Sequence, residues 1–317
     1  MIKQITTFTN LKNKYGWLNG SYLFFTRYIS RNKYYAILIE KLKQEFRTEI
    51  EDIKITSKSC SNNKLDEMNT CIIWILWYQG YEKMPKLVKK CYNSLLKNVK
   101  SDKYKIILLD NKNIEKYVEI PENILEKYKE GKITNTHLSD LIRILLLSQY
   151  GGIWVDSTCY FINAINDNLT KYSFISPKTG KENKFFNEGK WSVYFMGMGE
   201  NNCIAAFMAE LFNAYWEKND YMCDYFLIDI LMKIGYEEIP EIKEQIDTVP
   251  INNDNTMYVL NHWNEKYESN FREKISDCLF IKLDWRREKR YRKYSVGEYV
   301  NEELLGNKTA FEERVKK

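Results

Sequence analysis

The sequence is poor in the residues that metal centres, disulfide frameworks and membrane-spanning helices require. It has only two histidines, and its seven cysteines are scattered without a CxxC pair. Several cysteines fall in or beside apolar runs, so we expect small buried residues in a reducing compartment. No run approaches the roughly 20 apolar residues of a spanning helix, and the N-terminus lacks a signal-peptide core. We therefore expect a cytoplasmic protein, or one that is peripheral at the inner face of the cell membrane.

The composition favours a globular chain with a large core. Apolar residues make up 44% and aromatic residues 15% of the 317 residues, which excludes a largely disordered chain. The net charge of +5 comes from 48 basic and 43 acidic residues, and it is too small and too evenly spread to indicate a nucleic-acid partner. The length suits one large α/β domain with appendages or two modest domains.

A strand–helix–strand unit is the first strong structural pattern. The apolar run at 71–78 (CIIWILWY) predicts a parallel strand covered on both faces, and Gln79 and the following glycine end it. A helix over 85–97 and a second strand over 105–109 follow. Because ligands bind outside the carboxyl ends of such strands, we expect the ligand edge of the sheet at Gln79 and Asp110.

The segment 133–159 carries a second helix–strand pair. Apolar residues at helical spacing predict a helix that Thr134 or Thr136 caps. Gly151 and Gly152 stop the helix, because glycine readily takes the left-handed conformation. The short apolar stretch 153–155 then predicts a buried strand.

Three charged residues of this segment are candidates for a binding site. Asp140 and Arg143 are three apart, so they lie on one side of the helix. Asp156 follows the strand, at the end where ligands bind in open α/β sheets. Taken singly, the first two predict a surface ion pair and the third a turn residue. Their order and spacing within one unit favour a shared site.

This arrangement resembles the sugar-nucleotide site of GT-A glycosyltransferases. Asp140 and Arg143 match the SDxxR element, and Gly151 to Asp156 match the GGxxxD element, of family-32 enzymes and the large clostridial glucosylating toxins. The bacterial capsular-polysaccharide branch of family 32 is similar from about Ile72 to about Arg286. The resemblance implies an α/β fold, with a GT-A-type (Rossmann-like) mixed twisted sheet flanked by helices.

The resemblance also implies a function. It predicts a retaining hexosyltransferase that uses a nucleotide sugar, UDP-galactose or UDP-glucose, and a lipid-linked oligosaccharide acceptor of capsular or surface polysaccharide. Two alternatives stay open: a toxin-like enzyme that glucosylates a protein, and an idle module that binds a nucleotide sugar or a lipid. The oligomeric state is not predicted.

The resemblance assigns roles to individual residues. Trp77 stacks on the uracil, Asp140 and Arg143 contact the sugar and ribose, and an acidic helix start at Asp224 faces the transferred sugar. The catalytic candidates are Asp156, Asp224 and Arg143. The donor-binding candidates are Trp77, Gln79, Asp140, Arg143, Gly152, Asp156, Lys282, Trp285 and Arg286. A core position for Trp74 and Trp77 is the structural alternative.

A divalent cation, Mn²⁺ or Mg²⁺, is part of the same expectation. Asp156 begins the DxD motif, but Thr158 stands where the second carboxylate is expected. A hydroxyl is a weak ligand for hard cations, which prefer carboxylate oxygens. We therefore predict Asp156, Thr158 and His262 as the metal ligands, with the histidine compensating for the missing carboxylate.

The ends of the chain differ from its centre. Aromatic and basic residues interleave over 22–33, and a helix is expected over 33–51. This pattern suits a membrane interface, and a helical subdomain packed on the core is the alternative. We expect an N-terminal extension over 1–60, a linker over 61–69, a glycosyltransferase domain over 70–286 and a basic helical tail over 287–317. The basic run 285–294 predicts a surface for anionic lipid or a lipid diphosphate, or merely a solvated face.

The region after residue 160 predicts an α+β pattern. Strands are expected over 173–176 and 191–198, and helices over 202–218 and 224–234. The second strand lies where enzymes of the resembled family recognise the acceptor.

Overall fold

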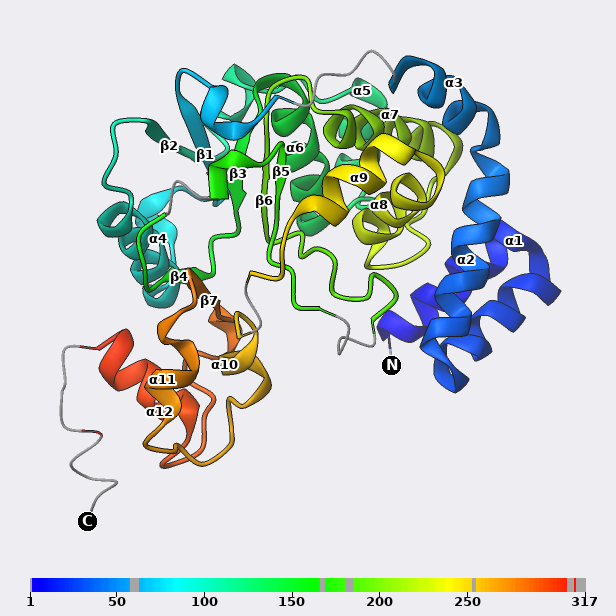
Figure 1. The fold of residues 1–317 in the computed structure, drawn as a ribbon. Coiled ribbons are helices and arrows are strands. Elements are labelled where there is room, and N and C mark those ends of the chain that lie inside the picture. The colour runs from blue at the N-terminus through cyan, green and yellow to red at the C-terminus, as the bar shows by residue number, and fades with distance from the viewer. Residues whose placement is uncertain are drawn as a thin grey trace.

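A central sheet organises the chain (Figure 1). The structure is a computed structural model that describes residues 2–57, 63–165, 169–180, 185–252, 255–306 and 311. Five strands pair in the order β2-β1-β3-β6-β5. In chain order they are β1 (Cys71–Leu76), β2 (Tyr104–Leu109), β3 (Gly152–Val155), β5 (Phe174–Ile175) and β6 (Phe195–Met198).

The sheet is mixed. Strand β1 pairs in parallel with β2 and β3, whereas β6 is antiparallel to β3 and to β5. Strand β1 lies between two parallel neighbours, and its two faces pack in two different apolar cores, which explains its unbroken apolar sequence. Trp74 packs in the core on one face of β1, and Ile73 packs in the core on the other. The predicted fold class, α/β with a mixed sheet flanked by helices, is confirmed.

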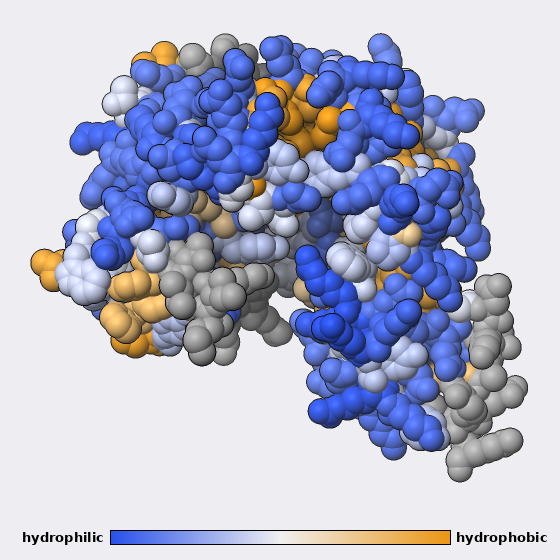
Figure 2. All heavy atoms as spheres, turned by 180° about the vertical axis from the view of Figure 1, so that it is seen from behind, coloured by the Kyte–Doolittle hydropathy of each residue, from blue (hydrophilic) through white to orange (hydrophobic). Residues whose placement is uncertain are grey.

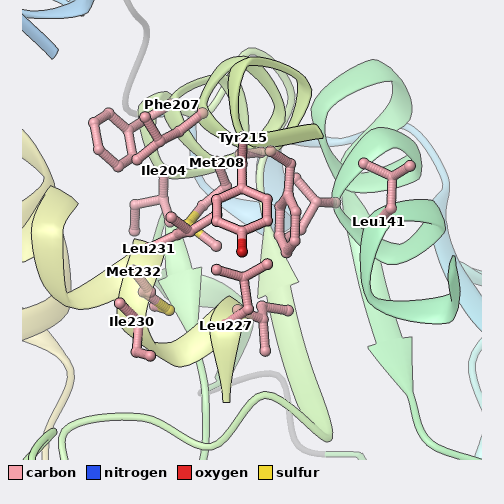
Figure 3. Close-up of a cluster of buried hydrophobic side chains, with 14 of the residues drawn as sticks. Leu141, Ile204, Phe207, Met208, Tyr215, Leu227, Ile230, Leu231 and Met232 are labelled. Atoms are coloured by element: carbon pink, nitrogen blue, oxygen red, sulfur yellow. The ribbon is translucent and has the colours of Figure 1, made fainter. Parts of the chain in front are cut away.

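Helices cover both faces of the sheet (Figure 1). Helix α4 connects β1 with β2, and Leu95 of α4 belongs to the same core cluster as Ile73. On the other face, α6, α7 and α8 enclose an apolar core that includes Leu141, Phe207 and Leu231 (Figure 3). The helices of this region are α4 (Lys86–Asn98), α5 (Glu122–Lys129), α6 (Asn135–Tyr150), α7 (Cys203–Lys218), α8 (Leu227–Glu238) and α9 (Pro240–Thr248).

The N-terminal extension is helical, as predicted, and it packs on the core. It comprises α1 (Ile2–Ile29), α2 (Arg31–Glu45) and α3 (Arg47–Ser57). Helix α1 is kinked at Gly16, whose φ of 77° favours glycine. The two halves of α1 fold back on each other, and Phe8 lies 5.0 Å from Phe24 between ring centroids. The single helix expected over 33–51 is in fact two helices that meet at Phe46.

A second cluster forms near the C-terminus. A two-stranded sheet of β4 (Cys159–Phe161) and β7 (Phe280–Lys282) joins it to the main sheet region. Trp263, Phe271 and Tyr299 are central members of its apolar core, to which Leu87 of α4 also belongs. Its other elements are α10 (Tyr258–Asn261), α11 (Phe271–Ser276), α12 (Val296–Tyr299) and a π-helix (Val300–Leu304).

This cluster bears on the predicted boundaries. Residues 295–305 pack in the same core as residues 259–283, so this part of the chain is not a separate tail that begins at 287. The linker predicted over 61–69 begins at residues that lie outside the described ones. Its described part contains a short 3₁₀-helix, Leu65–Glu67, whose first residue is buried.

None of the helices in the described part of the chain is long and apolar enough to span a membrane. The six cysteines described there are all buried and free of disulfides, as the scattered spacing predicts.

Candidate functional site

A cleft of about 710 Å³ opens at the carboxyl ends of β1 and β3. Viewed from behind, the molecule has a hollow between two lobes (Figure 2). One lobe carries helices α1 and α2, and the other is formed by residues 258–305. The cleft is lined by the chain after β1, the first turns of α6, the turn after β3, and the segment after β7. The lining residues are Leu76, Trp77, Tyr78, Gln79, Lys83, Pro85, Asn135, Thr136, Ser139, Asp140, Arg143, Trp154, Asp156, Ser157, Thr158, Tyr225, Leu260, Lys282, Leu283, Asp284, Trp285 and Arg286.

Two glycines bring α6 and β3 into position for this cleft. Gly151 ends α6 with a φ of 62° and donates its N–H to the carbonyl of Leu147. Gly152 has a φ of 95°, and a Cβ there would overlap the carbonyl oxygen of Ile72 on β1. Glycine is therefore required for the close pairing of β3 with β1, and Asp156 follows at the strand end.

Arg143 lies between two carboxylates. Its Nη2 atom is 3.1 Å from Oδ1 of Asp156 and 3.3 Å from Oδ1 of Asp140. The guanidinium also lies over the ring of Trp154, 4.9 Å from its centroid. The indole N–H of Trp154 donates to Oδ1 of Asp156 at 2.9 Å. Helix α6 and strand β3 together hold one compact cluster of charges.

Arg143 also has hydrogen-bonding capacity to spare. The side chain is only 5% exposed, and its Nε and Nη1 atoms have no hydrogen-bond partner among the described residues. Buried donors without partners are uncommon in native structures. Three N–H groups of this cleft residue, one on Nε and two on Nη1, therefore lack an acceptor among the described residues, and a ligand hydroxyl that reached them would satisfy this capacity.

Lys282 contacts the other oxygen of the Asp156 carboxylate. Its Nζ atom donates to Oδ2 of Asp156 at 2.7 Å and to Oγ1 of Thr158 at 2.8 Å. The antiparallel pairing of β4 with β7 sets this geometry, because Cys159 lies opposite Lys282 in the ladder. The backbone N–H of Leu283 donates to the carbonyl of Thr158, which fixes the turn.

The two acidic residues of the cluster respond differently to burial. Burial raises the pKa of Asp140 to about 7, although Arg143 opposes the shift. Burial also acts to raise the pKa of Asp156, but Lys282 and Arg143 outweigh it and lower the value. Asp156 is therefore a firmly ionised carboxylate, whereas Asp140 exchanges its proton near neutral pH.

An aromatic corner lies at the end of the cleft. The rings of Trp77 and Trp285 meet edge to face with centroids 6.2 Å apart. The indole N–H of Trp77 is buried and has no hydrogen-bond partner among the described residues. Trp74, in contrast, is a core residue whose indole N–H donates to the carbonyl of Gly151. The structural alternative thus applies to Trp74, while Trp77 lines the cleft.

Most residues predicted to bind the donor lie together in the cleft, and Gly152 does not line it. Gln79 and Arg286 line it beside the charged cluster and the aromatic corner. Gly152 is buried in the sheet, where its lack of a side chain serves strand pairing.

Asp224 lies outside the cleft, against its predicted role. It is 2% exposed, accepts a hydrogen bond from the hydroxyl of Tyr34 at 2.9 Å and lies 3.5 Å from Arg27. Both partners belong to the N-terminal extension. Helix α8 begins at Leu227, so Asp224 lies before the helix, where it connects the extension to the core.

His262 also lies outside the cleft. Its Nδ1 atom is 2.8 Å from the carbonyl oxygen of Tyr258, and its ring stacks on that tyrosine. It is therefore not grouped with Asp156 and Thr158 as a third ligand.

The residues beside Asp156 do not fit a hard divalent cation. In the described ranges, no group of three or more His, Cys, Asp or Glu side chains is placed to hold a metal ion. Asp156 is already paired with Arg143 and Lys282, and the Thr158 hydroxyl accepts from Lys282. A divalent cation in a nucleotide site is usually held by one or two carboxylates together with substrate phosphates, and the one carboxylate of this turn is already paired with two cations of the chain.

Several cleft residues were not predicted from the sequence, and Trp154 and Tyr225 are two of them. The indole N–H of Trp154 donates a hydrogen bond to Asp156. From the sequence, its place in a short apolar strand predicts only a core residue. Tyr225 lines the cleft with its ring 5.9 Å from that of His137, whereas the preceding Asp224 points away. The side chains of these two neighbouring residues face different parts of the molecule, and no local sequence signal predicts which of them faces the cleft.

The sheet and its helices define an α/β protein with a cleft at the carboxyl ends of its strands, and comparison with known proteins identifies the family. The family model for capsular polysaccharide synthesis protein matches residues 22–301. The chain belongs to this family. The matched region includes the sheet, the whole cleft and part of the N-terminal extension.

Curated relatives match over shorter stretches. The chain is 29% identical over 103 residues to the O-glycosyltransferase braB of Annulohypoxylon truncatum, which covers 30% of this chain and 24% of the relative. It is 26% identical over 144 residues to the O-glycosyltransferase PaGT of Phomopsis amygdali, covering 43% and 33%. The matches thus span about a quarter to a third of those relatives.

A solved structure shows a partial likeness. The PaToxG glycosyltransferase aligns with 76% of this chain and 95% of its own, at 14% identity and a TM-score of 0.38.

Proposed function

We propose that the cleft binds a UDP-sugar, and that the chain transfers its glucose or galactose to an acceptor oxygen in surface-polysaccharide synthesis with retention of configuration. The observation that carries the proposal is the cluster of Asp140, Arg143 and Asp156 in a cleft at the strand ends of a capsular polysaccharide synthesis family member. The names of the two curated relatives, both O-glycosyltransferases, support transfer to oxygen.

The chemistry of the cleft suits each part of a UDP-sugar. Aromatic faces stack on bases, and Trp77 with Trp285 supplies such a surface for the uracil. The spare N–H groups of Arg143 would donate to ribose or sugar hydroxyls, and Asp140 would accept from them. Lys282 lies beside this cluster to meet the diphosphate.

The reaction breaks the bond between the sugar C1 and the diphosphate oxygen and forms a bond from C1 to the acceptor oxygen. Negative charge grows on the diphosphate as the first bond breaks, and Lys282 and Arg286 would stabilise it. Asp156 is held between Arg143 and Lys282, so it orients these cations and does not attack C1. The acceptor proton would pass to the departing diphosphate, with the protein supplying orientation.

The N-terminal extension supports a lipid-linked acceptor. Helix α1 exposes Trp17, Phe25 and Ile29, while Leu11 and Leu23 of the same helix are buried. Exposed aromatic residues beside basic ones suit the headgroup region of an anionic membrane. We propose that this face lies on the inner leaflet, where a lipid-linked glycan would be presented.

UDP release from a panel of UDP-sugars tests the proposal. We expect slow hydrolysis of UDP-glucose or UDP-galactose by the wild type, and loss of at least about 100-fold in Asp156→Asn and Arg143→Met, because both substitutions dismantle the charged cluster. Asp247→Asn, a surface carboxylate paired with Lys243, is the matched control and should retain full activity. If none of the UDP-sugars is hydrolysed and none binds, the proposal is wrong.

A further inference from the structure

The ammonium group of Lys282 lies where a cation shared by Asp156 and Thr158 would lie. Its Nζ atom is 2.7 Å from the Asp156 carboxylate and 2.8 Å from the Thr158 hydroxyl. Both values are ordinary hydrogen-bond lengths for a charged donor. The two positions that begin and end the DST turn are therefore already bridged by a cation of the chain itself.

The charges of this arrangement balance. A DxD motif with a divalent cation combines two negative charges with two positive ones. Here Thr158 removes one negative charge, and Lys282 supplies one positive charge in place of two. The local net charge is the same in both cases. A lysine together with a threonine can therefore take the place of a divalent cation together with a second carboxylate.

Backbone hydrogen bonds fix the main chain at Lys282, and the contacts of Nζ hold the side chain. The backbone N–H of Lys282 donates to the carbonyl of Thr256 at 2.9 Å, and the next residue, Leu283, donates to the carbonyl of Thr158 at 2.9 Å. The side chain is 14% exposed and lies 5.1 Å from the ring centroid of Tyr194. A lysine side chain that is already ordered in the free protein loses little conformational entropy when it binds a ligand.

We propose that Lys282 replaces the divalent cation of the DxD site, so that the donor diphosphate binds and leaves without metal. An ammonium has three N–H donors. Asp156 and Thr158 take two of them, and the third remains for a diphosphate oxygen in the cleft that Lys282 lines. This inference rests on the proposed function, since it concerns how the same cleft binds its donor.

Calorimetric titration of the wild type with UDP tests the inference directly. We expect the dissociation constant of UDP to change less than about threefold between 1 mM EDTA and 1 mM Mn²⁺. Lys282→Gln should weaken UDP binding about tenfold or more in EDTA, because a charge-assisted contact is lost. The matched control is Lys243→Gln, which breaks a surface pair with Asp247 at 2.6 Å and should bind UDP like the wild type.

A second variant converts the site in the opposite direction. The double substitution Thr158→Asp with Lys282→Gln places two carboxylates at the turn and removes the cation that bridges its two ends, while Arg143 stays paired with Asp156. We expect it to bind Mn²⁺ in the presence of UDP, seen as loss of the free-Mn²⁺ signal in electron paramagnetic resonance, whereas the wild type should leave that signal unchanged. Thermal melting of each variant shows whether it is folded.

The outcomes separate this inference from the proposed function. UDP binding by the wild type that needs Mn²⁺, with a tenfold or greater loss in EDTA, would overturn the inference and leave the proposed function standing. Absence of UDP and UDP-sugar binding in both conditions would overturn both. Metal-independent binding that Lys282→Gln leaves unchanged would also contradict the role of Lys282.

Discussion

The Nζ atom of Lys282 lies 2.7 Å from Oδ2 of Asp156, although the two residues are 126 positions apart in the chain. Arg143 contacts the other oxygen of the same carboxylate at 3.1 Å. Asp156 therefore lies between two cations supplied by different parts of the fold. This arrangement places two cations and one carboxylate of the chain in contact at the cleft.

Arg143 should be required for both stability and activity. Arg143→Met leaves Asp140 and Asp156 without a shared cation, and we expect the free energy of unfolding to fall by about 3 kcal/mol, since breaking a buried ion pair strands a charge. Arg143→Lys keeps the charge but loses the planar donor set, so it should keep most of the stability while UDP-sugar hydrolysis falls at least about tenfold. Urea denaturation and UDP release measure the two effects. Equal activity of the lysine variant and the wild type would contradict the donor role.

Substitution of Trp77 should affect UDP binding, whereas substitution of Trp74 should affect the stability of the fold. Trp77→Ala should weaken UDP binding by about 1–3 kcal/mol, the usual loss for a stacked base, with a small effect on stability. Trp74→Ala should instead lower the free energy of unfolding by about 3–5 kcal/mol, because it empties a site in the core. Calorimetric titration and urea denaturation distinguish the two variants. A Trp77→Ala protein that binds UDP like the wild type would remove Trp77 from the site.

Asp229 should make stability depend on pH. It is buried, accepts from the indole N–H of Trp191 at 3.0 Å, and burial raises its pKa from 3.8 to about 7. A folded-state pKa above the unfolded value stabilises the native state fully below about pH 4, and this contribution is lost as the pH rises through about 7.

Asp229→Asn removes that dependence, because asparagine is neutral throughout. Relative to the wild type, we expect the variant to gain on the order of 4 kcal/mol in free energy of unfolding between pH 4 and pH 8. Urea denaturation at the two values measures it. A stability difference that is constant across this range would show that Asp229 ionises freely.

Asp224 should support the docking of the N-terminal extension and not catalysis. Asp224→Ala leaves the buried hydroxyl of Tyr34 without its acceptor, so we expect a loss of about 1–3 kcal/mol in stability. UDP-sugar hydrolysis below the melting temperature should stay within a few-fold of the wild type. Tyr34→Phe is the matched variant, because it removes the other partner of the same bond. A loss of hydrolysis in folded Asp224→Ala beyond 100-fold would return Asp224 to the catalytic site.

The exposed face of α1 should bind anionic vesicles. Replacing Trp17, Phe25 and Ile29 with serine removes apolar surface that is between 60% and 85% exposed, so folding should be little affected. Sedimentation with phosphatidylglycerol vesicles should carry down the wild type but not the variant, and phosphatidylcholine vesicles should carry down neither. Equal sedimentation of both proteins would refute the membrane role of this face.

Local patterns predicted the elements near the site, because their signals lie within a few residues. The run at 71–78 gave β1, the helical spacing and two glycines gave α6 and its end, and Asp156 stands where a strand end was expected. Helix boundaries were less accurate where tertiary packing decides them. The break at Phe46 and the kink at Gly16 both serve packing of the extension against α7 and α8 and against itself.

The charge partners of the site could not be predicted from local sequence. Lys282 meets Thr158 because β4 and β7 pair in one particular register, and a shift of one residue would turn the lysine to the other face. In the same way, Asp224 and Tyr225 are neighbours that point in different directions, and only the packing of α1 and α2 decides which one faces the cleft.

A crystal structure of the chain with UDP tests the account's central claim most directly. We predict that the uracil lies against Trp77, that the ribose is within hydrogen-bond distance of Asp140 or Arg143, and that a diphosphate oxygen contacts Lys282. A nucleotide bound elsewhere on the molecule, or in the cleft with its diphosphate directed away from Lys282, would contradict the account.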